Sequence, residues 1–290
     1  AENEQAEAQF IVDRIDELID QGDTVYGDCA VFYRTNAQSR AIEDALVRAG
    51  MPYRVVGGTR FYERKEIKDA LAYLRVLANP ADDVNLRRII NVPKRSIGDR
   101  TVAMLGAFAE RERVTFFEAL ERADEVPGLS SRAKGPLEKF RALFADLQST
   151  AEGAQVARVL ESVLEQTGYL AELQASTDPQ DESRVDNLAE LVAVAEAFDA
   201  RGEGATLDDF LELVSLSSDA DQIPDEESGE VTLMTLHTAK GLEFPTVFLT
   251  GMEDGSFPHQ RSFNDPSEMS EERRLAYVGL TRAQKRLILT

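Results

Sequence analysis

The sequence predicts an α/β domain that is interrupted by an all-helical insertion, and three observations carry this prediction. Residues 27–56 read as strand, helix and strand, with a connection of about a dozen residues, which favours parallel pairing of the strands. Apolar residues then recur at helical spacing from about residue 63 to residue 216, without a convincing strand. Strand patterns return after residue 230.

The first α/β part begins with a helix and then alternates strands and helices. Asn36 is a residue type that caps helix N-termini, and Gly50 suits the left-handed position that ends a helix. The segment GDCAVFYR has the apolar run of a buried strand, with polar residues at both ends. The expected elements are a helix at 4–20, a strand at 27–34, a helix from Asn36 to about Ala49, a strand at 52–56 and a turn at Gly57-Gly58.

Helix breakers and a linker set the limits of the insertion. Pairs such as Asn79-Pro80 and Gly135-Pro136 divide the helical stretch into about seven or eight helices. An acidic segment with a proline, at about 217–229, precedes the second α/β part. That part is expected to contain strands at 231–236, 245–251 and 286–290, with a helix from its N-cap Ser270 to about Arg282. We therefore predict one α/β domain that is split by a helical insertion.

The net charge of −21 is unevenly distributed along the chain. Residues 171–230 carry a net charge of −16, whereas residues 60–100 carry +4. The overall charge argues against a general nucleic-acid coat protein. We expect phosphate contacts in the basic stretch, and solvent or a protein against the acidic one.

Several kinds of site and location are not expected. Cys29 is the only cysteine and lies in an apolar run, which indicates a buried thiol, excludes an internal disulfide and fits a reducing cytoplasm. His237 and His259 lie 22 residues apart with no cysteine near them, so we expect no metal site. No apolar run approaches the ~18 residues of a membrane span. The acidic start of the chain is unlike a signal peptide.

Polar residues at the ends of the expected strands are of the types that form half of a nucleotide site. Tyr33 can stack on a base, and the guanidinium groups of Arg34 and Arg282 can bind phosphate oxygens. Glu243 can accept a hydrogen bond from a ribose hydroxyl. The sequence has no G-x-x-x-x-G-K-[ST] loop to hold phosphates. The missing half of such a site is the phosphate loop and its metal ligand.

A basic segment after the Gly57-Gly58 turn is a candidate for single-stranded nucleic acid. Arg60 and Arg64 flank the aromatic Phe61, and a basic pair around an aromatic side chain suits a stacked single strand. A helix start packed on the protein core is the alternative interpretation.

A second basic segment, PKRSIGDRT at 93–101, lies in the insertion. Gly98 is expected to open a helix, whose free backbone N–H groups can bind phosphate without reading sequence. Lys94, Arg95 and Arg100 add positive charge. A plain turn between helices is the alternative.

Four segments resemble motifs of the superfamily-one helicases of the UvrD and PcrA type. VFYRTNAQSRAIEDAL (31–46) resembles motif IV, and RFYERKEIKDALAYLR (60–75) is similar to the block that follows it. VTLMTLHTAKGLEFPTVFLTGMEDGSFPH (231–259) resembles motif V with its extension. EERRLAYVGLTRAQKRL (271–287) resembles motif VI. The segments occur in the family's order over essentially the whole chain.

The resemblance implies a RecA-like motor domain of the P-loop NTPase type, called 2A, that lacks the P-loop itself and is interrupted by a helical 2B domain. It places 2A at residues 1–86 and 225–290 and 2B at residues 87–224. In this family two motor domains clamp ATP with Mg²⁺, and the other motor domain supplies the phosphate loop and the metal ligand. The resemblance further implies that Tyr33 stacks on adenine and that Glu243 holds the ribose. It makes Arg34 and Arg282 catalytic arginine fingers on the γ-phosphate.

The resemblance also implies DNA contacts. His237, Thr238 and Lys240 would touch the single strand or transmit the nucleotide state, with an ordinary polar loop as the alternative. In the insertion, the family usually has Gly-Ile-Gly and uses it to grip duplex DNA, whereas this chain has Ser96 in the first of the three positions. The residues expected to contact duplex DNA are Lys94, Arg95, Ile97, Gly98 and Thr101.

The expected function is that of one half of an ATP-dependent DNA helicase, acting in repair or replication on the nucleoid of a bacterial cytoplasm. Its expected partners are single-stranded and duplex DNA, the other motor domain, and repair proteins or a second copy of the chain. No membrane is expected among them. The isolated chain should not hydrolyse ATP. A regulatory DNA- or protein-binding module and a part of a helicase–nuclease of the RecB or AddA type remain as alternatives.

Overall fold

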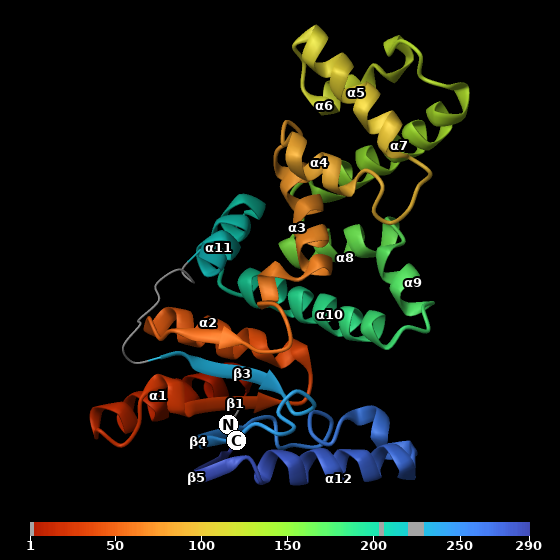
Figure 1. Cartoon of the computed structure of the whole chain (residues 1–290). Coiled ribbons are helices and arrows are strands. Elements are labelled where there is room, and N and C mark those ends of the chain that lie inside the picture. Colours follow the sequence, from red (N-terminus) through yellow and green to blue (C-terminus); the bar gives the residue numbers. More distant parts are fainter. Residues whose placement is uncertain (1–2, 203–205, 220–228) are drawn as a thin grey trace. The chain divides into compact units, whose positions relative to one another are not determined.

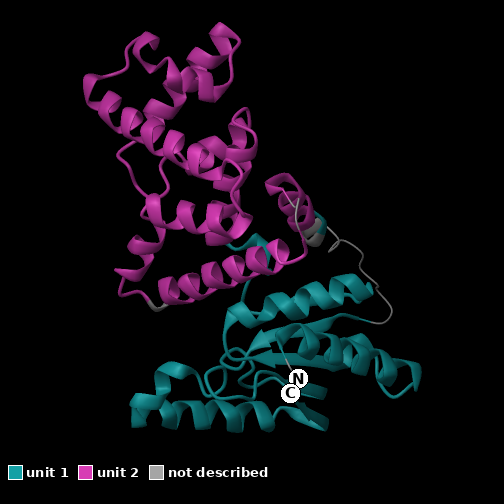
Figure 2. Ribbon diagram, turned by 180° about the vertical axis from the view of Figure 1, so that it is seen from behind, with its two compact units in different colours: residues 1–64, 216–290 teal, residues 65–215 magenta. Residues whose placement is uncertain are grey.

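The computed structural model describes residues 3–202, 206–219 and 229–290. The chain forms two compact units, shown in different colours in Figure 2. Unit 1 combines Ala1–Arg64 with Leu216–Thr290, and unit 2 is Lys65–Ser215. One unit is therefore assembled from both ends of the sequence, as the prediction of an interrupted domain requires.

Unit 1 contains a parallel sheet of five strands in the order β2-β3-β1-β4-β5. The strands are β1 (Cys29–Tyr33), β2 (Tyr53–Val55), β3 (Val231–Thr235), β4 (Phe244–Leu249) and β5 (Ala283–Leu289). Strand β3 lies between β2 and β1, so strands from the two parts of the sequence alternate within one sheet. This arrangement confirms the predicted α/β class with a parallel sheet.

Helices cover both faces of the sheet. Figure 1 shows α1 (Glu4–Asp20) and α2 (Ser39–Ala49) on one face and α12 (Pro266–Leu280) on the other. Since successive side chains of a strand point to opposite faces, β1 divides its residues between two apolar clusters. Val31 and Tyr33 pack with α1 and α2, whereas Phe32 packs with Leu275 of α12.

The strand register decides which loops share an edge of the sheet. Tyr33 pairs with Thr235 at the carboxyl ends of β1 and β3, and Phe244 pairs with Ala283 at the amino ends of β4 and β5. We call these the carboxyl edge, which carries residues 34–36 and 236–240, and the amino edge, which carries Glu243 and Arg282. The two edges lie roughly 25 Å apart along the strands, at about 3.3 Å per residue.

Unit 2 is helical throughout its described residues. Its α-helices are α3 (Lys65–Ala78), α4 (Asp83–Ile89), α5 (Asp99–Glu112), α6 (Phe116–Glu121), α7 (Ser131–Ala151), α8 (Val156–Gln166), α9 (Tyr169–Gln174), α10 (Pro179–Asp199) and most of α11 (Leu207–Asp219). Short 3₁₀ helices are η1 (Tyr26–Asp28), η2 (Asn36–Gln38), η3 (Phe61–Glu63), η4 (Ala123–Glu125) and η5 (Gln260–Asn264).

The helical unit begins at Lys65, earlier than the boundary at residue 87 that the sequence suggests. Helix α3 packs on α4, α8 and α10. Two carboxylates on α3 also hold its neighbours: Glu66 accepts from Asn187 at 2.6 Å, and Asp69 accepts from Arg88 at 2.7 Å and from Tyr169 at 3.0 Å. A cut at 86/87 would separate α3 from these partners. The second limit lies at 215/216 rather than 224, and residues 220–228 fall outside the described part.

Helix α12 begins earlier than its sequence suggests. The side chain of Asp265, not Ser270, caps it by accepting from the backbone N–H of Ser267 at 2.7 Å, and Pro266 occupies the first turn. Asp followed by Pro is a strong start signal, because proline lacks the N–H group that the first turn leaves unpaired. The helix ends at Leu280, so Arg282 lies beyond it, directly before β5.

Candidate functional site

The four residues predicted to meet a nucleotide do not gather at one place. Tyr33 and Arg34 lie at the carboxyl edge of the sheet, whereas Glu243 and Arg282 lie at the amino edge. The strand register therefore places one pair of these residues at each edge of the sheet.

Tyr33, the last residue of β1, is completely buried in the apolar cluster that the sheet forms with α1 and α2. Burial, and secondarily the negative charge of Glu43, raise the pKa of its hydroxyl. Stacking on a base requires an exposed ring face. This placement gives no support to the prediction that Tyr33 stacks on adenine.

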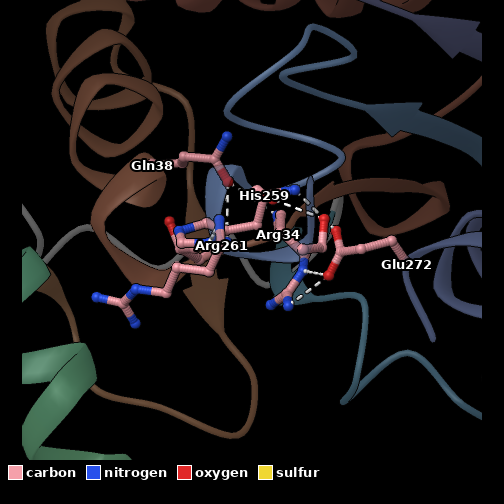
Figure 3. Close-up of polar contacts among 7 residues, drawn as sticks. Arg34, Gln38, His259, Arg261 and Glu272 are labelled. Atoms are coloured by element: carbon pink, nitrogen blue, oxygen red, sulfur yellow. Dashed lines mark hydrogen bonds and ion pairs between the residues drawn. The ribbon is translucent and has the colours of Figure 1, made fainter. Parts of the chain in front are cut away.

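Arg34 forms an ion pair within unit 1. Its Nε and Nη2 both donate to Oε1 of Glu272, at 2.8 and 2.6 Å, as Figure 3 shows. The other oxygen, Oε2, accepts from the backbone N–H of His259 at 3.0 Å. Burial of Glu272 would raise the pKa of its carboxyl, but the hydrogen bonds from Arg34 and His259 together hold that pKa below its ordinary value. In this structure Glu272 occupies the guanidinium group of Arg34, and the arginine-finger role of Arg34 stays a prediction.

Gln38 fixes the backbone around Arg34. Its Oε1 accepts from the backbone N–H groups of both Arg34 and Thr35, each at 2.9 Å. These bonds turn the chain from β1 into η2 and α2. The Arg34 side chain is thereby directed toward α12 at the carboxyl edge (Figure 3).

Glu243 and Arg282 adjoin each other at the amino edge. The backbone N–H of Phe244 donates to the carbonyl of Arg282 at 3.0 Å, so the residues directly before β4 and β5 are neighbours. Glu243 is exposed and Arg282 is half-buried. The guanidinium of Arg282 donates to the Val278 carbonyl at 3.2 Å and to Thr281 Oγ1 at 3.0 Å. A carboxylate and an arginine on one rim suit a ribose hydroxyl and a phosphate.

The loop after β3 presents polar side chains at the carboxyl edge. His237 and Lys240 are exposed, whereas Leu236 and Ala239 are buried and anchor the loop on the sheet. Burial, followed by the positive charge of Arg34, lowers the pKa of His237. The His237 imidazole therefore lies within electrostatic reach of the Arg34–Glu272 pair.

The turn after β2 lies against the same loop. Thr238 shares a hydrogen bond with Thr235 between their hydroxyl oxygens at 3.0 Å. A Cβ atom added to Gly57 would lie 2.7 Å from Cγ2 of Thr238, and Gly57 has a φ of 77°. Only glycine fits this close approach with a positive φ. The Gly57-Gly58 turn and residues 237–240 thus form one continuous rim.

Arg60, Phe61 and Arg64 have different environments. Phe61 is fully buried, and Arg64 donates to the carbonyls of Asn36 at 2.9 Å and Thr59 at 3.2 Å. For Phe61 and Arg64, the alternative of a helix start packed on the core describes the structure. Arg60 is half-buried, with its guanidinium 5.1 Å from the centre of the Tyr53 ring.

In unit 2 the basic segment at 93–101 begins with a loop that is held in place by hydrogen bonds. Oδ1 of Asn91 accepts from the backbone N–H groups of Arg95 at 2.8 Å and Ile97 at 3.2 Å. Arg95 donates to the Val92 carbonyl at 2.9 Å and to the Tyr73 hydroxyl at 2.7 Å, and Ile97 is buried. These contacts hold the Arg95 guanidinium within the loop, and the predicted duplex contacts of Arg95 and Ile97 stay predictions.

Fewer residues of this loop are exposed than were predicted to contact duplex DNA. Lys94 and Gly98 are exposed, Gly98 is the N-cap of α5, and Thr101 lies in the first turn of that helix. Ser96 has a φ of 62°, so serine adopts here the left-handed conformation that glycine favours. Lys94, Gly98 and Thr101 remain predicted duplex contacts.

In unit 1 the sequence reasoning missed the buried carboxylates of Glu43 and Glu272. Glu272 lies on the buried face of α12 with Leu275 and Gly279, at helical spacing, and a carboxylate in an apolar stripe was the available signal. Glu43 lies on the buried side of α2 and accepts from Ser39 and from the Phe61 N–H at 3.1 Å. Burial raises the pKa of the Glu43 carboxyl, although Ser39, Arg64 and Phe61 act against that rise.

Two further searches concern the described residues alone. In these ranges no group of three or more His, Cys, Asp or Glu side chains is arranged to hold a metal ion. None of the helices found there has both the length and the apolar character needed to cross a bilayer.

A RecA-like parallel sheet with charged loops at both edges, interrupted by a helical unit, is the architecture of the second half of a helicase motor. The chain belongs to the UvrD-like helicase C-terminal domain family, whose family model matches residues 1–290. It is 53% identical over 306 residues to the ATP-dependent DNA helicase UvrD1 of Mycobacterium tuberculosis. It is 45% identical over 294 residues to the ATP-dependent DNA helicase PcrA of Bacillus subtilis, and 44% identical over 292 residues to DNA helicase II of Haemophilus influenzae. These alignments cover 99 to 100% of the chain but 40% of each relative's length.

Proposed function

We propose that this chain is the second half of an ATP-dependent DNA helicase, with its two sheet edges serving two different ligands. The amino edge, with Glu243 and Arg282, faces ATP bound to another motor domain. The carboxyl edge, with His237, Thr238, Lys240 and Arg60, faces single-stranded DNA. The observation that carries the proposal is the separation of these residues to opposite edges of one sheet, with family membership over the whole chain.

At the amino edge, Arg282 is the proposed arginine finger and Glu243 the proposed ribose contact. An arginine on the γ-phosphate stabilises the charge that develops in phosphoryl transfer, and such a residue is worth about 10³–10⁵ in rate. ATP brings Mg²⁺, and the phosphate loop and metal ligands are expected in the other motor domain. The carboxylates of unit 1 are therefore left to position the nucleotide rather than the metal.

At the carboxyl edge, exposed side chains of the Gly57–Arg60 turn and of residues 237–240 contact the DNA backbone. Lys240 supplies a point charge for a phosphate, and Arg60 a forked guanidinium. Residues 236–243 run from the carboxyl end of β3 to the amino end of β4. One short segment thus joins the proposed DNA edge to the proposed ATP edge, which suits a motor that couples hydrolysis to movement along a strand.

Unit 2 supplies the proposed duplex contact through Lys94, Gly98 and Thr101. Gly98 caps α5, a helix of 14 residues, and the exposed Lys94 adds charge to its start. Such a contact binds the phosphate backbone without reading sequence. Repair or replication in the cytoplasm is the cellular role that we propose for the whole protein.

The proposal is tested with the full-length protein. ATP turnover is measured with and without single-stranded DNA, together with strand separation of a duplex that carries a single-stranded tail. We expect turnover that DNA stimulates, and separated strands only when ATP is present. Full-length protein without DNA-stimulated turnover contradicts the proposed function. The 290-residue chain alone is the control, and ATP hydrolysis by it contradicts the half-site.

A further inference from the structure

We infer that Arg95 is a positioning residue of the proposed duplex contact, so that it acts on DNA through the loop it holds rather than by touching a phosphate. This inference rests on the duplex contact that is part of the proposed function. The loop is residues 91–98, which lie between α4 and α5. Lys94 and Gly98 are exposed in it, whereas the guanidinium group of Arg95 donates to groups of unit 2 itself.

The guanidinium group of Arg95 joins the end of α4 to the start of the loop. Its Nη1 donates to the carbonyls of Ile89, Val92 and Pro93, at 3.1, 2.9 and 3.2 Å. Ile89 is the last residue of α4, where a positive group also interacts favourably with the helix dipole. One arginine can serve several carbonyls because its N–H donors form a rigid planar fork, which lysine lacks.

A buried tyrosine of α3 completes this arrangement. Nη2 of Arg95 donates to the Tyr73 hydroxyl at 2.7 Å, and that hydroxyl donates in turn to the Val92 carbonyl at 2.5 Å. Tyr73 is 1% exposed, and burial raises the pKa of its hydroxyl to about 12, although the charge of Arg95 acts against the rise. The hydroxyl therefore keeps the proton that it donates to Val92. DNA cannot reach this group, so any effect of it on DNA binding must pass through the protein.

The backbone of the loop is fixed as well. Oδ1 of Asn91 accepts from the N–H groups of Arg95 and Ile97, and Ile97 is buried. Ser96, between these two residues, has a φ of 62°, a conformation that persists when the surrounding structure imposes it. The exposed residues of the loop are thereby in place before DNA arrives, and a contact of this kind binds more tightly because no loop has to be ordered on binding.

The test measures the Kd of the full-length protein for a blunt duplex and for a single strand of the same length, by fluorescence anisotropy. Arg95→Lys keeps the charge but not the planar fork, and Arg95→Gln keeps neither. We expect about tenfold weaker duplex binding in both variants, with the Kd for the single strand within about twofold of wild type. Lysine would largely preserve a direct phosphate contact. Duplex binding like that of wild type in Arg95→Lys, with a loss in Arg95→Gln, would therefore overturn the inference.

Tyr73→Phe is the second variant, because it removes a hydroxyl that DNA cannot touch. It should weaken duplex binding severalfold. In the Arg95→Lys background it should add little, since both residues hold the Val92 carbonyl. Unchanged duplex binding in Tyr73→Phe overturns the inference, and so do effects of the two changes that multiply.

Tyr169→Phe is the matched control in unit 2. The Tyr169 hydroxyl is also buried, but it donates to Asp69, at 3.0 Å, rather than to the loop. This variant should lose about as much thermal stability as Tyr73→Phe and keep the wild-type Kd for the duplex. An equal loss of duplex binding in both tyrosine variants would assign the effect to a general loosening of unit 2 and overturn the inference. Wild-type protein that binds the single strand but not the duplex contradicts the proposed duplex contact itself.

Discussion

Arg34 and Glu272 are 238 residues apart in the sequence, yet two nitrogen atoms of Arg34 donate to one oxygen of Glu272, at 2.8 and 2.6 Å. The pair joins the end of a strand from the first α/β part to a helix of the second. Both parts must therefore be folded into one unit for either charge to be paired. This makes Glu272 informative about the stability of unit 1.

Glu272→Gln should destabilise the chain more at pH 7 than at pH 4. The pKa of Glu272 in the folded protein is lowered, so its charged form contributes stability above the ordinary value of 4.5, and this contribution is lost as the pH falls through the lower folded-state pKa. Leaving Arg34 without its carboxylate should cost about 2 kcal/mol at pH 7. Urea unfolding midpoints at the two pH values measure the difference, and an equal loss at both would contradict the account.

Glu43→Gln should show the opposite pH dependence. Burial raises the pKa of Glu43, so the wild-type protein loses stability as the pH rises above the unfolded-state value of 4.5, and the glutamine variant has no such loss. The free energy of unfolding of the variant, taken relative to that of wild type, should therefore be higher at pH 7 than at pH 4. The same urea titrations provide the measurement. If both variants change in the same direction between the two pH values, the assignment of at least one carboxylate is wrong.

Lys240→Ala should weaken single-stranded DNA binding by the full-length protein and reduce its salt dependence. Each phosphate contact adds about 0.7 to the slope of log K against log salt for a single strand, so the slope should become shallower by about that amount. Fluorescence anisotropy at several salt concentrations measures it. Lys285→Ala is the control, because Lys285 is exposed within β5, away from the proposed DNA edge. Equal slopes for wild type and Lys240→Ala would contradict the proposed contact between Lys240 and a DNA phosphate.

Arg60→Ala and Arg64→Ala should separate DNA binding from stability. Arg64 is buried against two carbonyls and Ser39, with Glu43 3.8 Å away, so its loss should cost about 3 kcal/mol of unfolding free energy. Arg60 is half-buried and should cost less than about 1 kcal/mol while weakening DNA binding several-fold. Thermal melts and anisotropy of both variants decide the matter. A stable Arg64→Ala protein with weak DNA binding would restore the sequence-based prediction.

The fold class could be predicted because its patterns are local. The apolar run of β1 and the helical spacing of the insertion are visible within a few residues, and the structure confirms an α/β unit with a parallel sheet. The start of unit 2 at Lys65 was not visible, because the partners that hold α3, such as Asn187, lie more than a hundred residues away.

The candidate site was harder to predict because edges of a sheet follow from register. Glu243 follows β3 in the sequence but directly precedes β4, and in a parallel sheet the chain changes edge between one strand and the next. The same rule places Arg282, before β5, away from Arg34, after β1. A prediction that also considered the residue before each strand would have placed Glu243 and Arg282 at the amino edge. The burial of Arg64 could not be found in this way, because basic residues look alike in sequence and its partner Glu43 lies on another helix.

The division of the two edges is tested most directly by Arg282→Ala in the full-length protein. ATP turnover with saturating single-stranded DNA and the Kd for that DNA are measured for wild type and variant, with Arg286→Ala, which loses an exposed pair with Asp23, as the control. The account predicts a fall in turnover of about 10³-fold, with the Kd for DNA within about twofold of wild type. Turnover like that of wild type in Arg282→Ala would contradict the placement of ATP at the amino edge.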